Sequence, residues 1–194
     1  ENRYNIITLV NSFHGRTMNT LTACGQEALH PACFGPYPQG FVYCEKKLDE
    51  IKAAVNEKTC AVMMEMIQGE GGVIPLDKDF VTAVCDFAKE KDILIIIDEV
   101  QTGIGRTGKL LAFQNYGIKP DIITLAKGLG GGLPIGACLC TKELGSTMSA
   151  GSHGSTFGGN PIVCAGASYV LGKVNNEAFL AEVQEKGKYL REKL

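Results

Sequence analysis

The chain has 194 residues, of which 19 are Lys or Arg and 21 are Asp or Glu, so that its formal net charge is -2. The two signs of charge are interspersed, which argues against nucleic acid and anionic membranes as partners because no basic face is present to bind phosphate groups. The length suffices for one domain with a sizeable core. No apolar run approaches the roughly 20 residues of a membrane span, so we expect a soluble protein.

Strand and helix patterns alternate along the chain. In chain order they predict strands at 6–10, 60–67, 93–97, 122–125 and 136–141, and helices at 48–55, 78–91 and 161–174. This alternation is typical of crossover units. The predicted fold class is therefore α/β, with a mostly parallel sheet covered by helices on both faces.

The domain organisation is simple, because only the Asn175-Asn176 pair interrupts the pattern as a domain boundary would. We expect residues 1–175 to form part of one large domain, and residues 176–194 to begin a helix that leads to another. The chain starts at Glu1 without an initiator Met and ends inside an amphipathic pattern. We therefore expect a piece of a longer protein.

The eight cysteines include no pair at the two-residue spacing of zinc or thioredoxin motifs. Most lie in apolar runs, as Cys138 and Cys140 do, and we expect buried free thiols in the reducing environment of the cytoplasm. The only histidines are His14, His30 and His153, and no two of them have the spacing of metal ligands on one helix. No metal site is expected.

The residues after the predicted strands carry the functional signal, since ligands of α/β sheets bind beyond the carboxyl ends of the strands. These positions hold the segments 11–16, 68–72, 98–101 and 127–132. Of the 24 glycines, 17 lie in residues 69–72 and 103–159. Glycine in such loops allows the main chain to approach a ligand closely.

A nucleotide-binding interpretation fails on its details. The run GIGRTGK at 103–109 resembles a P-loop, but Leu110 stands where Ser or Thr must hold magnesium, and the run follows the acidic strand instead of preceding it. The run GLGGG at 128–132 is followed by Leu133 and Pro134, so it is no dinucleotide fingerprint either.

Lys127 and Asp98 favour a different chemistry. Lys127 lies where an apolar strand meets a glycine run, and an ammonium group there is costly unless it is paired or converted to an imine. Asp98 ends a neighbouring strand. A Lys that binds a cofactor aldehyde and an acid that pairs with a pyridinium nitrogen are the two groups that pyridoxal phosphate requires.

Several long motifs then occur in a definite order: NSFHGRT at 11–17, EMIQGEGG at 65–72, IIIDEVQTGIGRTG at 95–108, TLAKGLGGGLPIGA at 124–137 and GSHGSTFGGNP at 151–161. Through them the chain resembles the class III, ornithine-type aminotransferases, which use pyridoxal 5'-phosphate on fold type I. The resemblance extends over nearly the whole chain and implies the same fold, cofactor and activity.

The resemblance implies a cofactor site made of Phe13, Asp98, Glu99, Val100, Gln101, Lys127 and Thr156. Lys127 would hold the cofactor as a Schiff base and move the proton, and Asp98 would keep the ring nitrogen protonated. Gln101 would touch the phenolic oxygen, and Phe13 would stack on the ring. Thr156 would reach the phosphate of the other subunit, which implies a homodimer with shared active sites.

The resemblance also implies three substrate-binding residues: Arg16, Glu70 and Ser155. Arg16 would bind a carboxylate through two parallel hydrogen bonds. Glu70 would act as a gate that moves aside for 2-oxoglutarate, and Ser155 would contact an acylated donor. The motif around His153 favours the acetylornithine and succinylornithine branch, with acetylornithine preferred and arginine biosynthesis as the pathway. Ornithine and 4-aminobutyrate remain alternative donors.

A second hypothesis is that the chain by itself is an inactive structural module. The family's glycine turn for the cofactor phosphate would lie upstream of Glu1, and its second substrate arginine would lie in the C-terminal small domain. Loss of these charge-assisted contacts removes roughly 1.5 to 3 kcal/mol each.

Overall fold

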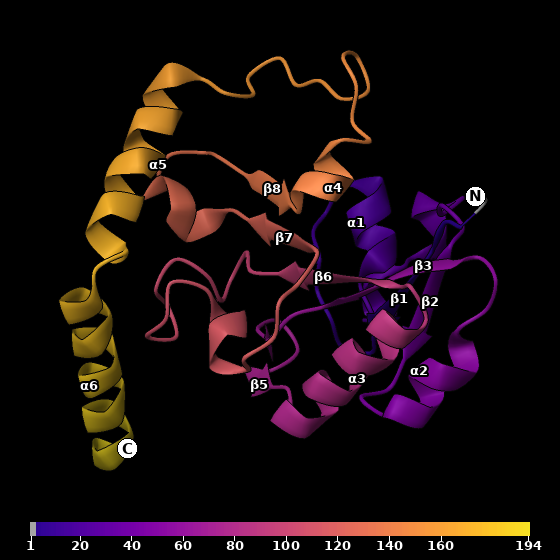
Figure 1. Ribbon diagram of the computed structural model, residues 1–194, viewed down its shortest axis with the longest axis horizontal. Helices are drawn as coiled ribbons and strands as arrows, with labels where there is room; N and C mark the ends of the chain where they lie inside the picture. Colours follow the sequence, from indigo (N-terminus) through magenta and orange to yellow (C-terminus); the bar gives the residue numbers. More distant parts are fainter. Residues whose placement is uncertain (1–2) are drawn as a thin grey trace. The chain divides into compact units, whose positions relative to one another are not determined.

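The computed structural model describes residues 3–194 and divides into two compact units, Glu1–Asp98 and Glu99–Leu194. Figure 1 shows the elements of each unit along the chain. The units are described separately below, as unit 1 and unit 2.

Unit 1 contains a parallel sheet of four strands: β1 (Asn5–Leu9), β2 (Phe41–Cys44), β3 (Thr59–Met64) and β6 (Leu94–Asp98). Their order is β2-β1-β3-β6, because β1 pairs with both β2 and β3, and β3 pairs with β6. Ile7, Thr8 and Leu9 are consecutive and all 0% exposed. Since successive side chains of a strand point to opposite faces, both faces of the sheet are covered.

The helices of unit 1 are α1 (Met18–Ala23), α2 (Leu48–Ala54) and α3 (Lys78–Glu90), with short 3-10 turns at Glu27–Leu29 and Ala32–Phe34. Figure 1 shows α1 on one side of the strands and α2 and α3 on the other. The side chain of Asp77 caps α3 by accepting a hydrogen bond from Phe80 N, and Val81, Val84 and Ala88 are buried. A small antiparallel hairpin, β4 (Ile67–Gln68) and β5 (Ile74–Pro75), follows β3.

Unit 2 contains the antiparallel strands β7 (Ile122–Leu125) and β8 (Ala137–Cys140). Its helices are η3 (Ala112–Asn115), η4 (Lys127–Gly130), α4 (Lys142–Gly145), α5 (Pro161–Val174) and α6 (Glu177–Lys193). The buried centre consists of Leu125, Leu129 and Ala167, which come from β7, η4 and α5. This core fixes the chain just before and just after Lys127.

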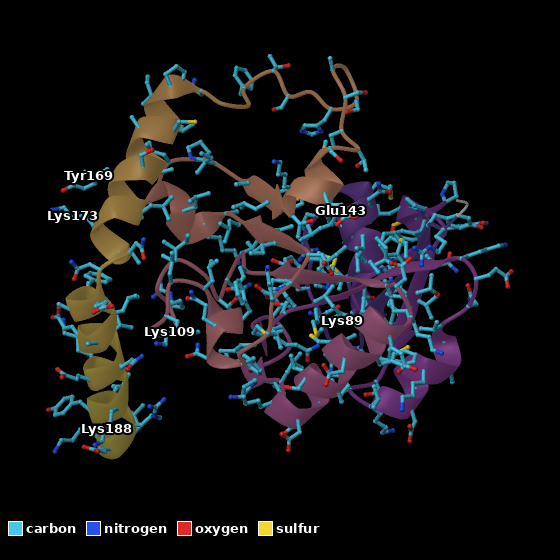
Figure 2. All side chains as sticks on the ribbon, in the orientation of Figure 1. Lys89, Lys109, Glu143, Tyr169, Lys173 and Lys188 are labelled. Carbon is cyan, nitrogen blue, oxygen red and sulfur yellow. The ribbon has the colours of Figure 1, made fainter. Side chains whose placement is uncertain are left out.

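The two long helices of unit 2 begin at asparagine caps, Asn160 for α5 and Asn176 for α6. Much of their surface is exposed. Tyr169 and Lys173 lie one turn apart on α5, and Lys173 Nζ lies 5.5 Å from the centroid of the Tyr169 ring (Figure 2). Gln184 of α6 donates a hydrogen bond of 2.8 Å to Gly108 O, so α6 contacts the 103–108 turn.

The predicted fold class is confirmed: the chain is α/β with a mostly parallel sheet. The predicted helix at 161–174 coincides with α5, and the strand at 122–125 coincides with β7. The strand predicted at 60–67 is too long, because β3 ends at Met64 and the chain turns at Glu65 into the hairpin. The strands β2 and β5, the helix α1 and the antiparallel direction of β8 were not predicted.

All eight cysteines are free thiols, but the expectation that they are buried is wrong for Cys33, Cys138 and Cys140, which are exposed. Cys138 and Cys140 lie on β8, and most residues of that strand are exposed. Within residues 3–194, no helix has both the length and the apolar character needed to cross a bilayer, and no cluster of His, Cys, Asp and Glu has the composition of a metal site.

Candidate active site

A buried histidine and aspartate meet at the carboxyl edge of the unit 1 sheet. His14 follows β1 and Asp98 ends β6, and His14 Nδ1 lies 2.9 Å from Asp98 Oδ2. The side chains are only 0% and 6% exposed. His14 Nε2 is also buried, and among residues 3–194 it has no hydrogen-bond partner. The contact fixes the orientation of the Asp98 carboxylate.

Glu65 provides a second buried carboxylate at the same edge, directly after β3. Its Oε1 accepts a hydrogen bond of 2.9 Å from Phe13 N, and its Oε2 lies 3.5 Å from Gly69 N. Burial raises the pKa of the Glu65 carboxyl above its usual range, and the charge of Asp98 adds to this shift. The Phe13 and Gly69 N–H groups and the His14 ring oppose it. The edge therefore holds three interacting titratable groups.

Phe13 and Arg16 lie in the same loop, with Arg16 Cζ 5.4 Å from the centroid of the Phe13 ring. Phe13 is partly exposed and Arg16 is exposed, and the Arg16 guanidinium group lies over the Phe13 ring. Gly15 between them has φ +134°, and a Cβ there would lie 2.6 Å from Thr20 Oγ1. Only glycine fits this turn.

Glu70 lies in the turn of the small hairpin and is exposed. The turn closes through hydrogen bonds from Gly72 N and Val73 N to Gly69 O, at 3.2 and 3.1 Å. The Glu70 side chain thus lies at the surface of unit 1.

Unit 2 begins with Glu99, whose buried carboxylate is bound by three donors of its own unit. Its Oε2 accepts hydrogen bonds from Thr102 Oγ1 at 2.6 Å and Ala112 N at 3.0 Å, and its Oε1 accepts one from Phe113 N at 2.8 Å. These bonds anchor the start of η3 to the turn that follows β6. Val100 and Gln101 lie in that turn and are partly buried.

Lys127 is the second residue after β7 and begins η4, with its backbone at φ +44°. A non-glycine residue is rare in this left-handed region, and such outliers cluster at functional sites. Its side chain is exposed, contrary to the sequence argument that an ammonium group would be buried there. The difference arises because only the neighbouring Leu125, Leu129 and Gly130 turn into the core.

Ser155 and Thr156 lie on the exposed segment before α5. The segment turns through a hydrogen bond of 3.2 Å from Gly158 N to Ser155 O. Both hydroxyl side chains are therefore open to a ligand or a second protein chain.

Unit 1 brings together two predicted site residues, Phe13 and Arg16, and places Asp98 with His14 and Glu65 at the strand ends. His14 and Glu65 had not been predicted as site residues, although His14 follows a predicted strand, Glu65 lies near the end of another, and both lie inside quoted motifs. Each unit holds groups whose chemistry suits pyridoxal phosphate. In unit 1 the buried Asp98 carboxylate suits a ring nitrogen and the Phe13 ring suits a flat ring, and in unit 2 the exposed Lys127 amine suits an aldehyde.

The family model for Aminotransferase class-III matches the chain over residues 1–194. The chain belongs to the class III aminotransferases. It is 53% identical to the acetylornithine aminotransferase of Caldanaerobacter subterraneus subsp. tengcongensis, over 99% of this chain and 49% of that protein. The chain thus spans about half the length of the curated relatives it matches.

Solved structures of this family share the fold. The ornithine aminotransferase of Toxoplasma gondii, crystallised with oxidised glutathione, matches with a TM-score of 0.92 and 31% identity, over 99% of this chain and 46% of that one. The N-acetylornithine aminotransferase of Stenotrophomonas maltophilia matches with a TM-score of 0.77 and 34% identity, over 98% and 44%. The likeness to class III aminotransferases therefore extends through both units.

Proposed function

We propose that the full-length protein carrying this chain is an acetylornithine aminotransferase, which transfers an amino group from N2-acetyl-L-ornithine to 2-oxoglutarate with pyridoxal 5'-phosphate. The observation that carries the proposal is the 53% identity to a curated acetylornithine aminotransferase over 99% of the chain. The reaction belongs to arginine biosynthesis, and we place the protein in the cytoplasm.

We assign the cofactor chemistry to Lys127 and Asp98. When bound, pyridoxal phosphate supplies an aldehyde and an electron-withdrawing ring that stabilises negative charge at the substrate Cα. Lys127 would hold the cofactor through its aldehyde, and its amine, once displaced by the substrate amine, would carry the proton between the substrate Cα and the former aldehyde carbon of the cofactor. Asp98 would accept a hydrogen bond from the protonated ring nitrogen and so keep that nitrogen protonated. The bond to His14 supports this role by fixing the Asp98 carboxylate.

Further cofactor contacts come from Phe13, Val100, Gln101 and Thr156. Phe13 would pack on the ring face and exclude water from it, Val100 would add apolar surface, and Gln101 would bind the phenolic oxygen. Thr156 binds the phosphate of a partner subunit in a homodimer, a proposal supported by its exposure. Glu99, also predicted as a cofactor contact, is assigned the role of holding the turn that carries Val100 and Gln101, because three donors of its own unit bind it.

The substrates are assigned to Arg16, Glu70 and Ser155. Arg16 binds a substrate carboxylate, a role supported by its exposed guanidinium group beside Phe13. Ser155 contacts the acyl group of the donor, and Glu70 gates the site between donor and 2-oxoglutarate. We further propose residues 1–175 as part of the cofactor-binding domain and residues 176–194 as the link to a small domain.

Ornithine is the second candidate donor, favoured by the TM-score of 0.92 to an ornithine aminotransferase. The identity of that protein to this chain is 31%, against 53% for the acetylornithine relative, which ranks acetylornithine first. Comparison of kcat/KM for acetylornithine, succinylornithine, ornithine and 4-aminobutyrate decides between the donors.

The cofactor assignment is tested by reducing the full-length protein with borohydride in the presence of pyridoxal phosphate, followed by peptide mapping. We expect the label on Lys127, and Lys127→Ala should lower kcat by more than about 100-fold. Lys109→Ala is the control, since Lys109 is an exposed lysine of the same unit (Figure 2). Labelling of another lysine, or no labelling, would refute the assignment.

A further inference from the structure

We propose that Glu65 is a positioning residue for the transamination, because its buried carboxylate couples the two loops that carry the substrate-binding residues of unit 1. The first is the Phe13 loop, residues 10–16, and the second is the Glu70 loop, residues 69–73. This inference rests on the proposed function, which gives Phe13, Arg16 and Glu70 their roles.

The carboxylate contacts one main-chain group of each loop. Oε1 accepts a hydrogen bond of 2.9 Å from Phe13 N, and Oε2 lies 3.5 Å from Gly69 N, the residue before Glu70. Glu65 is 4% exposed, and no lysine or arginine within residues 3–194 forms an ion pair with it. Burying a charged group costs several kcal/mol of desolvation free energy unless hydrogen bonds compensate this cost. Here the compensation comes from the two loops.

Two further observations show that the loops are packed against each other. Gln68 is 0% exposed, and its Nε2 donates a hydrogen bond of 2.9 Å to Val10 O. A Cβ on Gly71 would lie 2.7 Å from Asn11 O, so the main chains pass at a distance that only glycine allows. The Glu65 bridge therefore joins segments that already form one contact surface.

Only a carboxylate can serve both loops. Each of its oxygens is an acceptor, whereas a glutamine amide has one acceptor and one donor and would direct an N–H group toward one of the main-chain N–H groups. Bonds to a charged acceptor are also stronger than bonds to a neutral one. A glutamine of nearly the same shape is therefore expected to fill the space and to uncouple the loops.

The position of the Glu65 carboxylate affects residues of both loops. On one side the position of Phe13 N sets the ring, and Arg16 Cζ lies 5.4 Å from the centroid of that ring. On the other side Gly69 accepts the bonds that close the turn around Glu70. A shift of the Glu65 carboxylate thus displaces a carboxylate-binding side chain and a gating side chain together.

The test compares Glu65→Gln with the wild-type holoenzyme. Cofactor absorbance in single turnovers gives kcat/KM separately for the half-reaction with acetylornithine and the half-reaction with 2-oxoglutarate. We expect Glu65→Gln to lower both values about 10-fold or more, mainly through KM. Hydrogen exchange should become faster in residues 10–16 and 69–73 together.

The pH dependence supplies a readout that a purely structural role would not change. Protonated Glu65 resembles glutamine, so the ratio of wild-type to variant kcat/KM should approach one as the pH falls through the Glu65 titration. Burial raises the pKa of Glu65, which brings this titration toward neutral pH. His14 and Asp98 also face the carboxylate, but they are present in both proteins.

The control is Glu50→Gln. Glu50 Oε2 likewise accepts a main-chain hydrogen bond, of 3.0 Å from Glu45 N, but its side chain is 42% exposed and pairs with Lys47. Lys47 lowers the pKa of Glu50, the opposite direction to Glu65. We expect this variant to match the wild type in both half-reactions and in exchange of both loops.

Unchanged exchange in Glu65→Gln, or faster exchange in one loop only, overturns the proposal, as does a kcat/KM ratio that is constant with pH. If the variant does not fold, protection factors of the wild-type protein decide, because both loops should lose protection together as Glu65 becomes protonated. A wild-type protein without transaminase turnover instead refutes the proposed function, and the exchange measurement still decides the coupling.

Discussion

His14 Nδ1 lies 2.9 Å from Asp98 Oδ2, and this bond joins the loop after β1 to the last residue of β6, across 84 positions of the sequence. The histidine is buried behind the carboxylate, with its side chain 0% exposed. Asp98 is therefore held in a fixed orientation by the interior of unit 1. Any ligand that binds Asp98 meets an acceptor whose position is already set, which lowers the entropy cost of binding.

Replacement of the histidine tests the energetic value of this bond. His14→Phe keeps an aromatic ring of similar shape and removes a hydrogen bond to a charged group, which should cost about 2 kcal/mol of unfolding free energy. The matched control is His30→Phe, because His30 Nε2 lies 2.9 Å from the neutral acceptor Leu21 O, and we expect a cost of about 1 kcal/mol there. Urea unfolding of both variants measures the difference. Equal costs would show that the Asp98 bond is no stronger than a neutral one.

Glu99 permits a second test, because its carboxylate satisfies three donors at once. Glu99→Gln leaves one acceptor for Thr102 Oγ1, Ala112 N and Phe113 N, and should destabilise unit 2 by about 2 kcal/mol. Thr102→Val removes a single donor and should cost about 1 kcal/mol. Hydrogen exchange at residues 112–115 reports the effect locally. A glutamine variant with wild-type exchange there would contradict the anchoring role.

The predictable part of the fold was the part with strong local patterns. The α3 helix has a side-chain cap at Asp77 and buried residues at helical spacing, so its bounds follow from the sequence. The six residues of α1 are too few to show a period, and the apolar Met66 and Ile67 extend the β3 pattern past Glu65, where the chain in fact turns. Local patterns do not record turns that are set by distant hydrogen bonds.

The same limit applies to the candidate site. Ligands of α/β sheets bind beyond the carboxyl ends of the strands, and this rule located Phe13, which follows an apolar run, and Asp98, which ends one. It could not locate the hydrogen bond between His14 and Asp98 or the one that Phe13 N donates to Glu65, because the partners are 84 and 52 positions apart in the sequence. Such pairs depend on the order β1-β3-β6 in the sheet, and a single sequence does not specify that order.

The backbone of Lys127 gives a third prediction. Its φ of +44° is unfavourable for a residue with a Cβ and is open to glycine. We expect Lys127→Gly to be about 1 kcal/mol more stable than Lys127→Ala, although both variants lose the reactive amine. Thermal unfolding of the pair measures the strain without any contribution from the side-chain amine. Equal stability, or a more stable alanine variant, would show that the backbone relaxes at no cost.

The last prediction concerns stability and pH at Glu65. Burial raises the pKa of this carboxyl in the folded protein, so the folded state holds its proton at pH values where the unfolded chain, with an ordinary value of about 4.3, has lost it. The unfolding free energy therefore falls as the pH rises from about 4.3 through the raised folded-state pKa, and it stays lowered above that value. Glu65→Gln removes this term, so the unfolding free energy of the variant minus that of the wild type should increase as the pH rises through the same window. Thermal unfolding of both proteins between pH 4 and pH 8 measures it. A difference that stays constant between pH 4 and pH 8 would show that folding does not raise the pKa of Glu65.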